Sequence, residues 1–372
     1  MKIAFTGDTG FTKYFKGALA KPNLLDEKLV EFLNDSDITV VNVEGAVCTG
    51  EQNAQKPLLH SNPPEIAEFT KKLNGKIWNV ANNHINDCGT EGMLSTVQFA
   101  LSNGCQVLGA GKNKKEASKP IVVNDENGVK VGLVSVNYDK SAVATDTLPG
   151  CVFYTDFKTI KQSIKAVKKQ NAWCVLNVHA GDEFNAVPLP YIRKIYKKYL
   201  KLGADVVIGH HPHVVENYEK VGKKIIFYSL GNFVFDTDYQ RQQDYTQYGV
   251  LVKIDFGKKE FTFETQGTFI DRQTQTIRAH ELPKIFTNID KKLYKKLWPL
   301  SGWVLRLNER VKFLTIYPET KAFTSIVEWE NFERNLGTQR ANEENKAEKL
   351  FAKGEWQYAP KELVEYIKGQ RL

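Results

Sequence analysis

Segments of strand length alternate with amphipathic segments of helical periodicity between residues 1 and 284. Apolar runs such as 2–6 and 38–43 have the length of buried strands, whereas 190–202 has apolar residues at helical spacing. Strands that alternate with helices form parallel pairs, and the strand pairs that follow residue 224 favour antiparallel neighbours. The pattern therefore predicts an α/β fold in which helices cover mixed β-sheets.

The character of the sequence changes near residue 285. Residues 288–369 are rich in Lys and Glu and have mostly helical periodicity. We therefore predict a main domain over 1–284 and a helical C-terminal extension over 285–372.

Composition and charge place the chain among globular proteins, with 42% hydrophobic and 25% charged residues. A net charge of +8 fits either a Lys-rich solvated surface or a field that attracts anions. We expect no signal peptide, because residues 1–8 enter a strand directly, and no membrane span. The five cysteines are dispersed without CxxC spacing, which argues against a disulfide framework and favours a reducing compartment, the cytoplasm.

Side chains that bind metals follow five of the predicted strands. In open α/β sheets the carboxyl ends of the strands line the ligand crevice, so these residues are expected to meet there. They are Asp8, Glu44, Asn83 with His84, His179, and the group His210, His211 and His213.

The donor set of carboxylate, amide and imidazole contains no thiolate, which suits Mn²⁺, Fe²⁺ or Zn²⁺ in a hydrolytic site. Each residue alone is compatible with a turn or a hydrogen-bonded core position, but their joint placement favours a site for one or two divalent metal ions. Glu44 has two oxygens with which to bridge a pair of ions, and such a pair activates a water molecule.

The motifs resemble those of the CapA family, named for poly-γ-glutamate capsule biosynthesis, within the calcineurin-like metallophosphatase superfamily. The matching segments are GDTGF at 7–11, NVEG at 42–45, VANNHINDCG at 80–89, HAGDE at 179–183, GHHPHVVE at 209–216 and YSLGNFVFD at 228–236. The resemblance implies a four-layer αββα sandwich of two mixed β-sheets, with metal ions at one edge.

The resemblance also implies roles for individual residues. Asp8 and His213 would hold a first metal ion, Glu44 would bridge, and His84 would be the general acid. The ligands of the second ion would be Asn83, His179 and His211. Four further residues match family positions next to the ligands without an assigned role: Asn82, Glu183, His210 and Asn232.

This chain departs from the superfamily pattern at three positions. Gly10 stands where a histidine ligand is usual, which leaves the first ion with one ligand fewer. Glu44 replaces the usual bridging Asp, and Ala180 replaces a tryptophan common in the family.

Three functions remain open at this level. The first is a metal-dependent hydrolase that acts on a phosphoester or amide of an anionic small molecule or polymer, linked to capsule polymer metabolism. The second is a non-catalytic assembly or binding component of a polymer-synthesis complex with a degenerate metal site. Nucleic-acid processing is disfavoured, because the sequence has no platform of aromatic and basic residues for stacking bases. The sequence does not define the oligomeric state.

Overall fold

Two mixed β-sheets form the centre of the molecule. The computed structural model describes residues 1–48, 60–292 and 294–295. The first sheet has eight strands in the order β18-β17-β16-β1-β2-β5-β6, with β15 paired to β1. Its strands are β1 (Lys2–Thr9), β2 (Ile38–Val43), β5 (Ile77–Asn79), β6 (Gln106–Leu108), β15 (Asn232–Val234), β16 (Tyr248–Phe256), β17 (Phe261–Asp271) and β18 (Thr276–His280).

The second sheet has six strands in the order β13-β14-β12-β11-β9-β8. The inner strands β9, β11, β12 and β14 run parallel, while β8 and β13 pair antiparallel at the two edges. Its strands are β8 (Ile121–Asn124), β9 (Lys130–Asn137), β11 (Trp173–His179), β12 (Val206–His210), β13 (Tyr218–Val221) and β14 (Lys224–Phe227).

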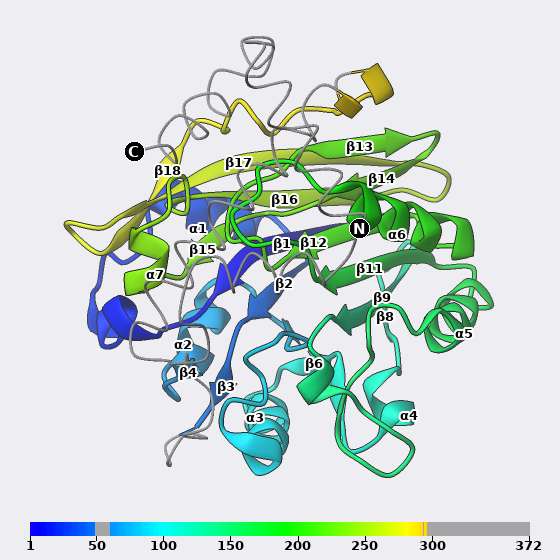
Figure 1. Ribbon diagram of the computed structural model, residues 1–372, viewed down its shortest axis with the longest axis horizontal. Helices are drawn as coiled ribbons and strands as arrows, with labels where there is room; N and C mark the ends of the chain where they lie inside the picture. The colour runs from blue at the N-terminus through cyan, green and yellow to red at the C-terminus, as the bar shows by residue number, and fades with distance from the viewer. Residues whose placement is uncertain (49–59, 293, 296–372) are drawn as a thin grey trace, which may run out of the picture.

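The two sheets face each other across one hydrophobic core, and helices cover their outer faces (Figure 1). Side chains alternate along β1, so that Ile3 and Phe5 enter the core between the sheets whereas Ala4 faces the helices of the first sheet. Leu133 and Val175 extend the inner core from the second sheet. This is the four-layer αββα arrangement that the resemblance predicts, and the mixed α/β fold is confirmed.

The helices and two small sheets complete the fold. Helices α1, α2 and α3 pack beside the first sheet, and α5 and α6 beside the second. The helices are α1 (Glu27–Asn34), α2 (Ile66–Lys72), α3 (Gly89–Ser102), α4 (Lys114–Ala117), α5 (Phe157–Lys168), α6 (Pro190–Leu202) and α7 (Asp238–Arg241), with 3₁₀ turns η1 (Lys13–Phe15), η2 (Ala18–Ala20) and η3 (Lys140–Ala142). The small two-stranded sheets pair β3 (Ala46–Val47) with β4 (Ser61–Asn62), and β7 (Ala110–Gly111) with β10 (Gly150–Cys151).

Local sequence chemistry explains several element ends. Asp26 caps α1 by accepting a hydrogen bond from the Lys28 amide, and Asp156 caps α5 in the same way through Thr159. Helix α6 begins at Pro190, which fits the first turn because its missing N–H has no partner there.

The helical extension predicted for 285–372 falls mostly outside the described residues. Within the described part, Ile285, Phe286 and Ile289 belong to the core between the sheets. The division of the chain at residue 284 therefore stays a prediction.

Candidate metal centre

Parallel pairing aligns the carboxyl ends of the strands that carry the candidate ligands. On the first sheet Asp8 of β1 lies opposite Asn42 of β2, two residues before Glu44. On the second sheet His179 of β11 lies opposite His210 of β12. The ends of the two sheets meet, because the His211 amide donates to Asp8 Oδ2 at 3.4 Å.

Asp8 is fully buried and lies among polar groups. Its Oδ1 accepts a hydrogen bond from Asn42 Nδ2 at 2.8 Å. The Nδ1 atoms of His210 and His213 lie 3.5 and 3.3 Å from its carboxylate oxygens. Burial would raise the pKa of Asp8, but these two imidazoles hold it well below its usual range, which keeps the carboxylate charged.

Glu44 is a buried carboxylate that is surrounded by imidazole rings. Its two carboxylate oxygens are buried and have no hydrogen-bond partner. The Oε1 atom faces three imidazole Nε2 atoms, those of His213 at 3.7 Å, His179 at 3.9 Å and His84 at 4.0 Å. Burial raises the pKa of Glu44 well above its ordinary value. A buried carboxylate without hydrogen bonds is costly unless a cation compensates its charge.

Asn82 joins the Glu44 loop to the Asn83-His84 loop. Its Oδ1 accepts from the Gly45 amide at 3.2 Å and from the His84 amide at 3.1 Å, and its Nδ2 donates to the Val43 carbonyl at 2.7 Å. With both ends of the amide used in this way, Asn82 positions other site residues rather than facing the centre itself.

The candidate ligand atoms of Asn83 and His179 face each other, Asn83 from the end of the first sheet and His179 from the end of the second. Asn83 Oδ1 lies 2.9 Å from His179 Nε2. Burial lowers the pKa of His179 well below its ordinary value, so the ring is neutral and one of its two nitrogens is unprotonated and able to bind a metal ion.

The turn that follows β12 holds its histidines in an unusual backbone conformation. His211 has φ +99° and His213 has φ +58°, the left-handed region that non-glycine residues rarely occupy. Such conformations persist at functional sites where the surrounding structure enforces them. Gly209 permits the strand to approach its neighbour, since a Cβ there would lie 1.8 Å from the Tyr228 carbonyl oxygen.

Asn232 sets the tautomer of His213. The Nδ2 of Asn232 donates to Gln240 Oε1 and to the Thr246 carbonyl, so its Oδ1 faces His213 Nδ1 at 2.9 Å. That nitrogen therefore carries a proton, and Nε2 is directed toward Glu44. Burial would lower the pKa of His213, but the carboxylates of Glu44 and Asp8 raise it to about 10. The site thus favours a cation at this Nε2, whether a proton or a metal ion.

The residues fit a divalent metal ion. Asp8, Glu44 and His213 each offer a ligand atom, and these atoms lie within 4.8 Å of one another. Glu183, His211 and His213 form a second such group. The donor set of carboxylates and imidazoles matches Mn²⁺, Fe²⁺ or Zn²⁺, and the unbonded oxygens of Glu44 are the groups that such an ion would satisfy. The candidate ligands therefore converge as the sequence predicts, while their metal-binding roles stay a proposal.

Phe235 explains the departure at Gly10. A Cβ at Gly10 would lie 2.9 Å from the Phe235 ring and 3.0 Å from the Glu44 carbonyl oxygen. The same ring stacks on His213 with centroids 4.9 Å apart. The Phe235 ring therefore leaves no room for a side chain at position 10 unless the ring moves.

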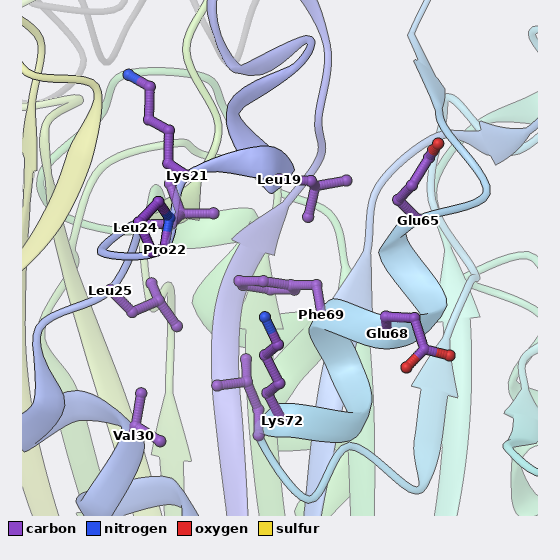
Figure 2. Close-up of a pocket in the computed structure, with 11 residues that line it drawn as sticks. Leu19, Lys21, Pro22, Leu24, Leu25, Val30, Glu65, Glu68, Phe69 and Lys72 are labelled. Atoms are coloured by element: carbon purple, nitrogen blue, oxygen red, sulfur yellow. The ribbon is translucent and has the colours of Figure 1, made fainter.

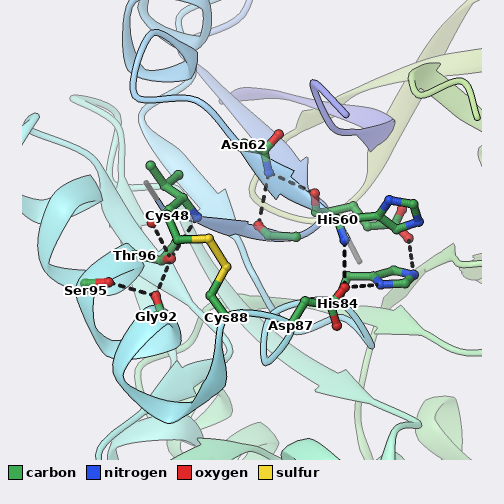
Figure 3. The surroundings of a disulfide bond; sticks show 12 residues. Cys48, His60, Asn62, His84, Asp87, Cys88, Gly92, Ser95 and Thr96 are labelled. Atoms are coloured by element: carbon green, nitrogen blue, oxygen red, sulfur yellow. Dashed lines mark hydrogen bonds and ion pairs between the residues drawn. A yellow bond between two sulfur atoms is a disulfide. The ribbon is translucent and has the colours of Figure 1, made fainter. Parts of the chain in front are cut away.

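Sequence reasoning missed two residues beside His84. Asp87 Oδ2 lies 2.7 Å from His84 Nδ1 and also accepts from the His60 amide at 2.8 Å (Figure 3). The His60 ring packs against that of His84, with centroids 4.1 Å apart. Asp87 was detectable as a carboxylate three residues after His84, whereas nothing in the local sequence around His60 indicated its position.

The cysteine prediction is wrong for one pair. Cys48 and Cys88 form a disulfide between the end of β3 and the start of α3 (Figure 3). The remaining three, Cys105, Cys151 and Cys174, are buried and free. The two bonded cysteines are 40 residues apart in sequence. No local spacing could have shown the pair, because the path of the chain brings them together.

A separate cavity of about 470 Å³ opens between η2, α1 and α2 (Figure 2). Apolar side chains such as Leu24, Val30 and Phe69 line it, with Lys21 and Glu68 among the charged lining residues. None of the candidate metal ligands lines this cavity, so it is not part of the metal centre.

The two-sheet αββα sandwich, with carboxylates, amides and imidazoles at its strand ends, is the arrangement that the resemblance to metallophosphatases implies. The family model described as "Bacterial capsule synthesis protein PGA_cap" matches residues 2–237. The chain therefore belongs to this family, and the CapA resemblance is confirmed.

Three relatives are 27% to 35% identical to this chain over the aligned residues. The chain is 35% identical over 222 residues to a "Capsule biosynthesis protein CapA" of Bacillus anthracis, covering 57% of this chain and 54% of the relative. It is 35% identical to the "PGA biosynthesis protein CapA" of Bacillus subtilis (strain 168), covering 66% of each. A "Probable polyglutamine synthesis accessory protein" of Mycobacterium tuberculosis is 27% identical over 54% of this chain and 56% of that one. The chain thus spans about half to two thirds of these relatives.

One similar solved structure has a title that describes a putative 5'-nucleotidase from Staphylococcus aureus in complex with alpha-ketoglutarate. The alignment covers 82% of this chain and 59% of that one. The TM-score is 0.44 and the identity is 12%. Among the described residues, no helix has the length and apolar character needed to span a membrane.

Proposed function

We propose that this protein is a metal-dependent hydrolase that cleaves a phosphoester or amide bond in an anionic substrate of capsule polymer metabolism, such as poly-γ-glutamate. One observation carries the proposal. Glu44 Oε1 is buried without a hydrogen bond and faces three imidazole Nε2 atoms at 3.7 to 4.0 Å. The names of the CapA relatives support the polymer, since they refer to capsule and PGA biosynthesis.

The side chains divide into ligands and a proton donor. Asp8, Glu44 and His213 would hold one divalent ion, and a second would lie near Asn83, His179 and His211. Bound ions of this kind lower the pKa of a coordinated water molecule and stabilise negative charge on the attacked group. The buried walls around His213, including Phe235, exclude bulk water and so strengthen these electrostatic interactions.

His84 is the group suited to protonate the leaving group. It is partly exposed, with 12% of its side chain accessible, so it can contact both the site and a substrate. Asp87 Oδ2 accepts a hydrogen bond from His84 Nδ1 at 2.7 Å, which orients the ring and directs Nε2 toward the metal centre.

The test uses purified protein, added Mn²⁺ and an aryl phosphate and an aryl amide as generic substrates. His84→Ala is expected to lose about 100-fold or more in turnover with Mn²⁺ affinity retained, because it removes the proton donor but no ligand. His211→Ala is expected to lose both. His280→Ala is the matched control, since His280 is exposed and lies outside the centre. The proposal fails if wild type hydrolyses neither substrate, or if His84→Ala behaves like His280→Ala.

A second candidate is a binding or assembly component whose metal centre is structural. Gly10 at the position of the usual histidine favours it, because one ligand is lost there. The Mycobacterium tuberculosis relative carries the word accessory in its name. This alternative predicts Mn²⁺ binding without turnover of any substrate, and dependence of polymer binding on the bound ion.

A further inference from the structure

The loop after β11 is fixed against the histidine turn that follows β12. The Phe184 amide donates to the Pro212 carbonyl at 2.8 Å, and the Phe184 ring lies over that of His213 with centroids 6.2 Å apart. Gly181 has φ +144°, and a Cβ there would lie 2.9 Å from Pro212 Cγ. These contacts hold Glu183, between Gly181 and Phe184 in the loop, beside the two histidines of the turn.

Glu183 offers a carboxylate oxygen to those histidines. The ligand atoms of Glu183, His211 and His213 all lie within 4.8 Å of one another. A metal ion with bonds of about 2.1 Å holds two of its ligand atoms at most about 4.2 Å apart, so shifts of less than about 1 Å bring the three into coordination. Glu183 is half-buried while both histidines are buried, so it lies on the solvent side of the centre.

The centre needs such a ligand. Gly10 offers no side chain, and Phe235 occupies the space next to it. Asp8, Glu44 and His213 alone are three ligands for the first ion, whereas divalent transition metals take at least four. A carboxylate that reaches His213 from the neighbouring loop after β11 supplies an additional oxygen without any change at position 10.

We propose that Glu183 is a direct metal ligand that acts with His211 and His213 and supplies the coordination lost at Gly10. The inference rests on the proposed function only in assuming that the centre binds metal ions. It differs from a role in which Glu183 merely orients a neighbouring histidine. Coordination by Glu183 places an acidic ligand at the solvent-facing side, where an incoming substrate oxygen would meet the ion.

The experiment measures Mn²⁺ binding by isothermal titration calorimetry and the visible spectrum of the Co²⁺-loaded protein. The variant is Glu183→Gln, which keeps the size of the side chain but replaces its charged oxygens. Asp182→Asn is the matched control, because it removes the same charge from the adjacent residue, whose carboxylate accepts from the Tyr191 hydroxyl. Circular dichroism of the metal-free proteins checks that both variants fold.

We expect Glu183→Gln to weaken Mn²⁺ binding by about 100-fold or more, beyond the 10- to 100-fold typical of residues that only orient a ligand. Asp182→Asn should weaken it by less than about fivefold through loss of charge alone. The Co²⁺ spectrum should change in Glu183→Gln and not in Asp182→Asn, since only a ligand alters the coordination sphere.

The inference is overturned if Glu183→Gln loses no more affinity than Asp182→Asn, or if its Co²⁺ spectrum equals that of wild type. If wild type nevertheless turns over the aryl substrates, the proposed function stands and only the role of Glu183 falls. A wild-type protein that binds neither Mn²⁺ nor Co²⁺ overturns both. If the Glu183→Gln protein is unfolded without metal, Glu183→Asp takes its place. The shorter side chain of Asp cannot reach the ion, so Mn²⁺ affinity should fall by the same factor.

Discussion

Replacing Cys48 and Cys88 by serine tests the one covalent cross-link of the described chain. The bond joins the strand after Glu44 to the residue that follows Asp87, and it closes a loop of 40 residues. Other contacts also hold the two segments together. The Val47 amide donates to Thr96 Oγ1 at 2.9 Å, so β3 stays against α3 without the bond. We therefore expect the folded structure to persist in Cys48→Ser/Cys88→Ser.

The magnitude follows from the unfolded chain. Closing a loop of this length removes conformational entropy from the unfolded state equivalent to about 4 kcal/mol at 25 °C. Because the folded contacts remain, the free energy of unfolding should fall by nearly this amount. Changes of 2 to 5 kcal/mol are typical when a native disulfide is removed, so the estimate is of the expected size.

Urea denaturation followed by tryptophan fluorescence and circular dichroism measures the loss. Oxidised wild type, wild type in dithiothreitol and the double variant are compared, and the last two should agree. Mass spectrometry of the unreduced wild type, alkylated in denaturant, should show three free thiols. A loss below about 1 kcal/mol in a wild type proven to be oxidised would refute the entropic argument. Five free thiols in an oxidising buffer would refute the pairing itself.

Three further predictions concern the centre and the core. Gly209→Ala should lower the free energy of unfolding by about 3 kcal/mol, because its Cβ meets the Tyr228 carbonyl at 1.8 Å; an unchanged urea midpoint would contradict this. Asp87→Asn should lower kcat on the aryl substrate about 10- to 100-fold with Mn²⁺ affinity unchanged, because it loosens His84 without removing a ligand; equal kcat would show that His84 does not depend on Asp87. Burial raises the pKa of the Cys151 and Cys174 thiols to about 12 and also raises that of Cys105. These three thiols in the native protein should therefore not react with a thiol reagent within minutes at pH 8, and rapid labelling would contradict their burial.

The disulfide also bears on the expected compartment. Disulfides persist in oxidising environments and are rare in the cytosol, whereas the dispersed cysteines favoured the cytoplasm on sequence alone. The thiol state of Cys48 in protein taken rapidly from its native cell, alkylated before lysis, decides which environment this domain meets.

Local patterns predicted the ligands but not the residues that support them. Asp8, Glu44 and His179 each follow an apolar strand, and that position is readable because strands and their ends are defined by neighbouring residues. His60 enters the centre from a loop, so its place depends on how that loop folds over other segments. The same limit explains why β13, β15 and β18 were not predicted as strands, since each is only 3 to 5 residues long and is stabilised by pairing with a distant segment.

The sequence by itself determined the α/β class, the positions of the main strands along the chain and the family, because hydrophobic periodicity and the spacing of ligand motifs are properties of contiguous residues. Only the tertiary structure decided that Cys48 bonds Cys88, that Phe235 fills the space beside Gly10 and that Asp87 holds His84. Such contacts depend on the path of the whole chain, which brings together residues whose separation in sequence carries no information about their distance in space.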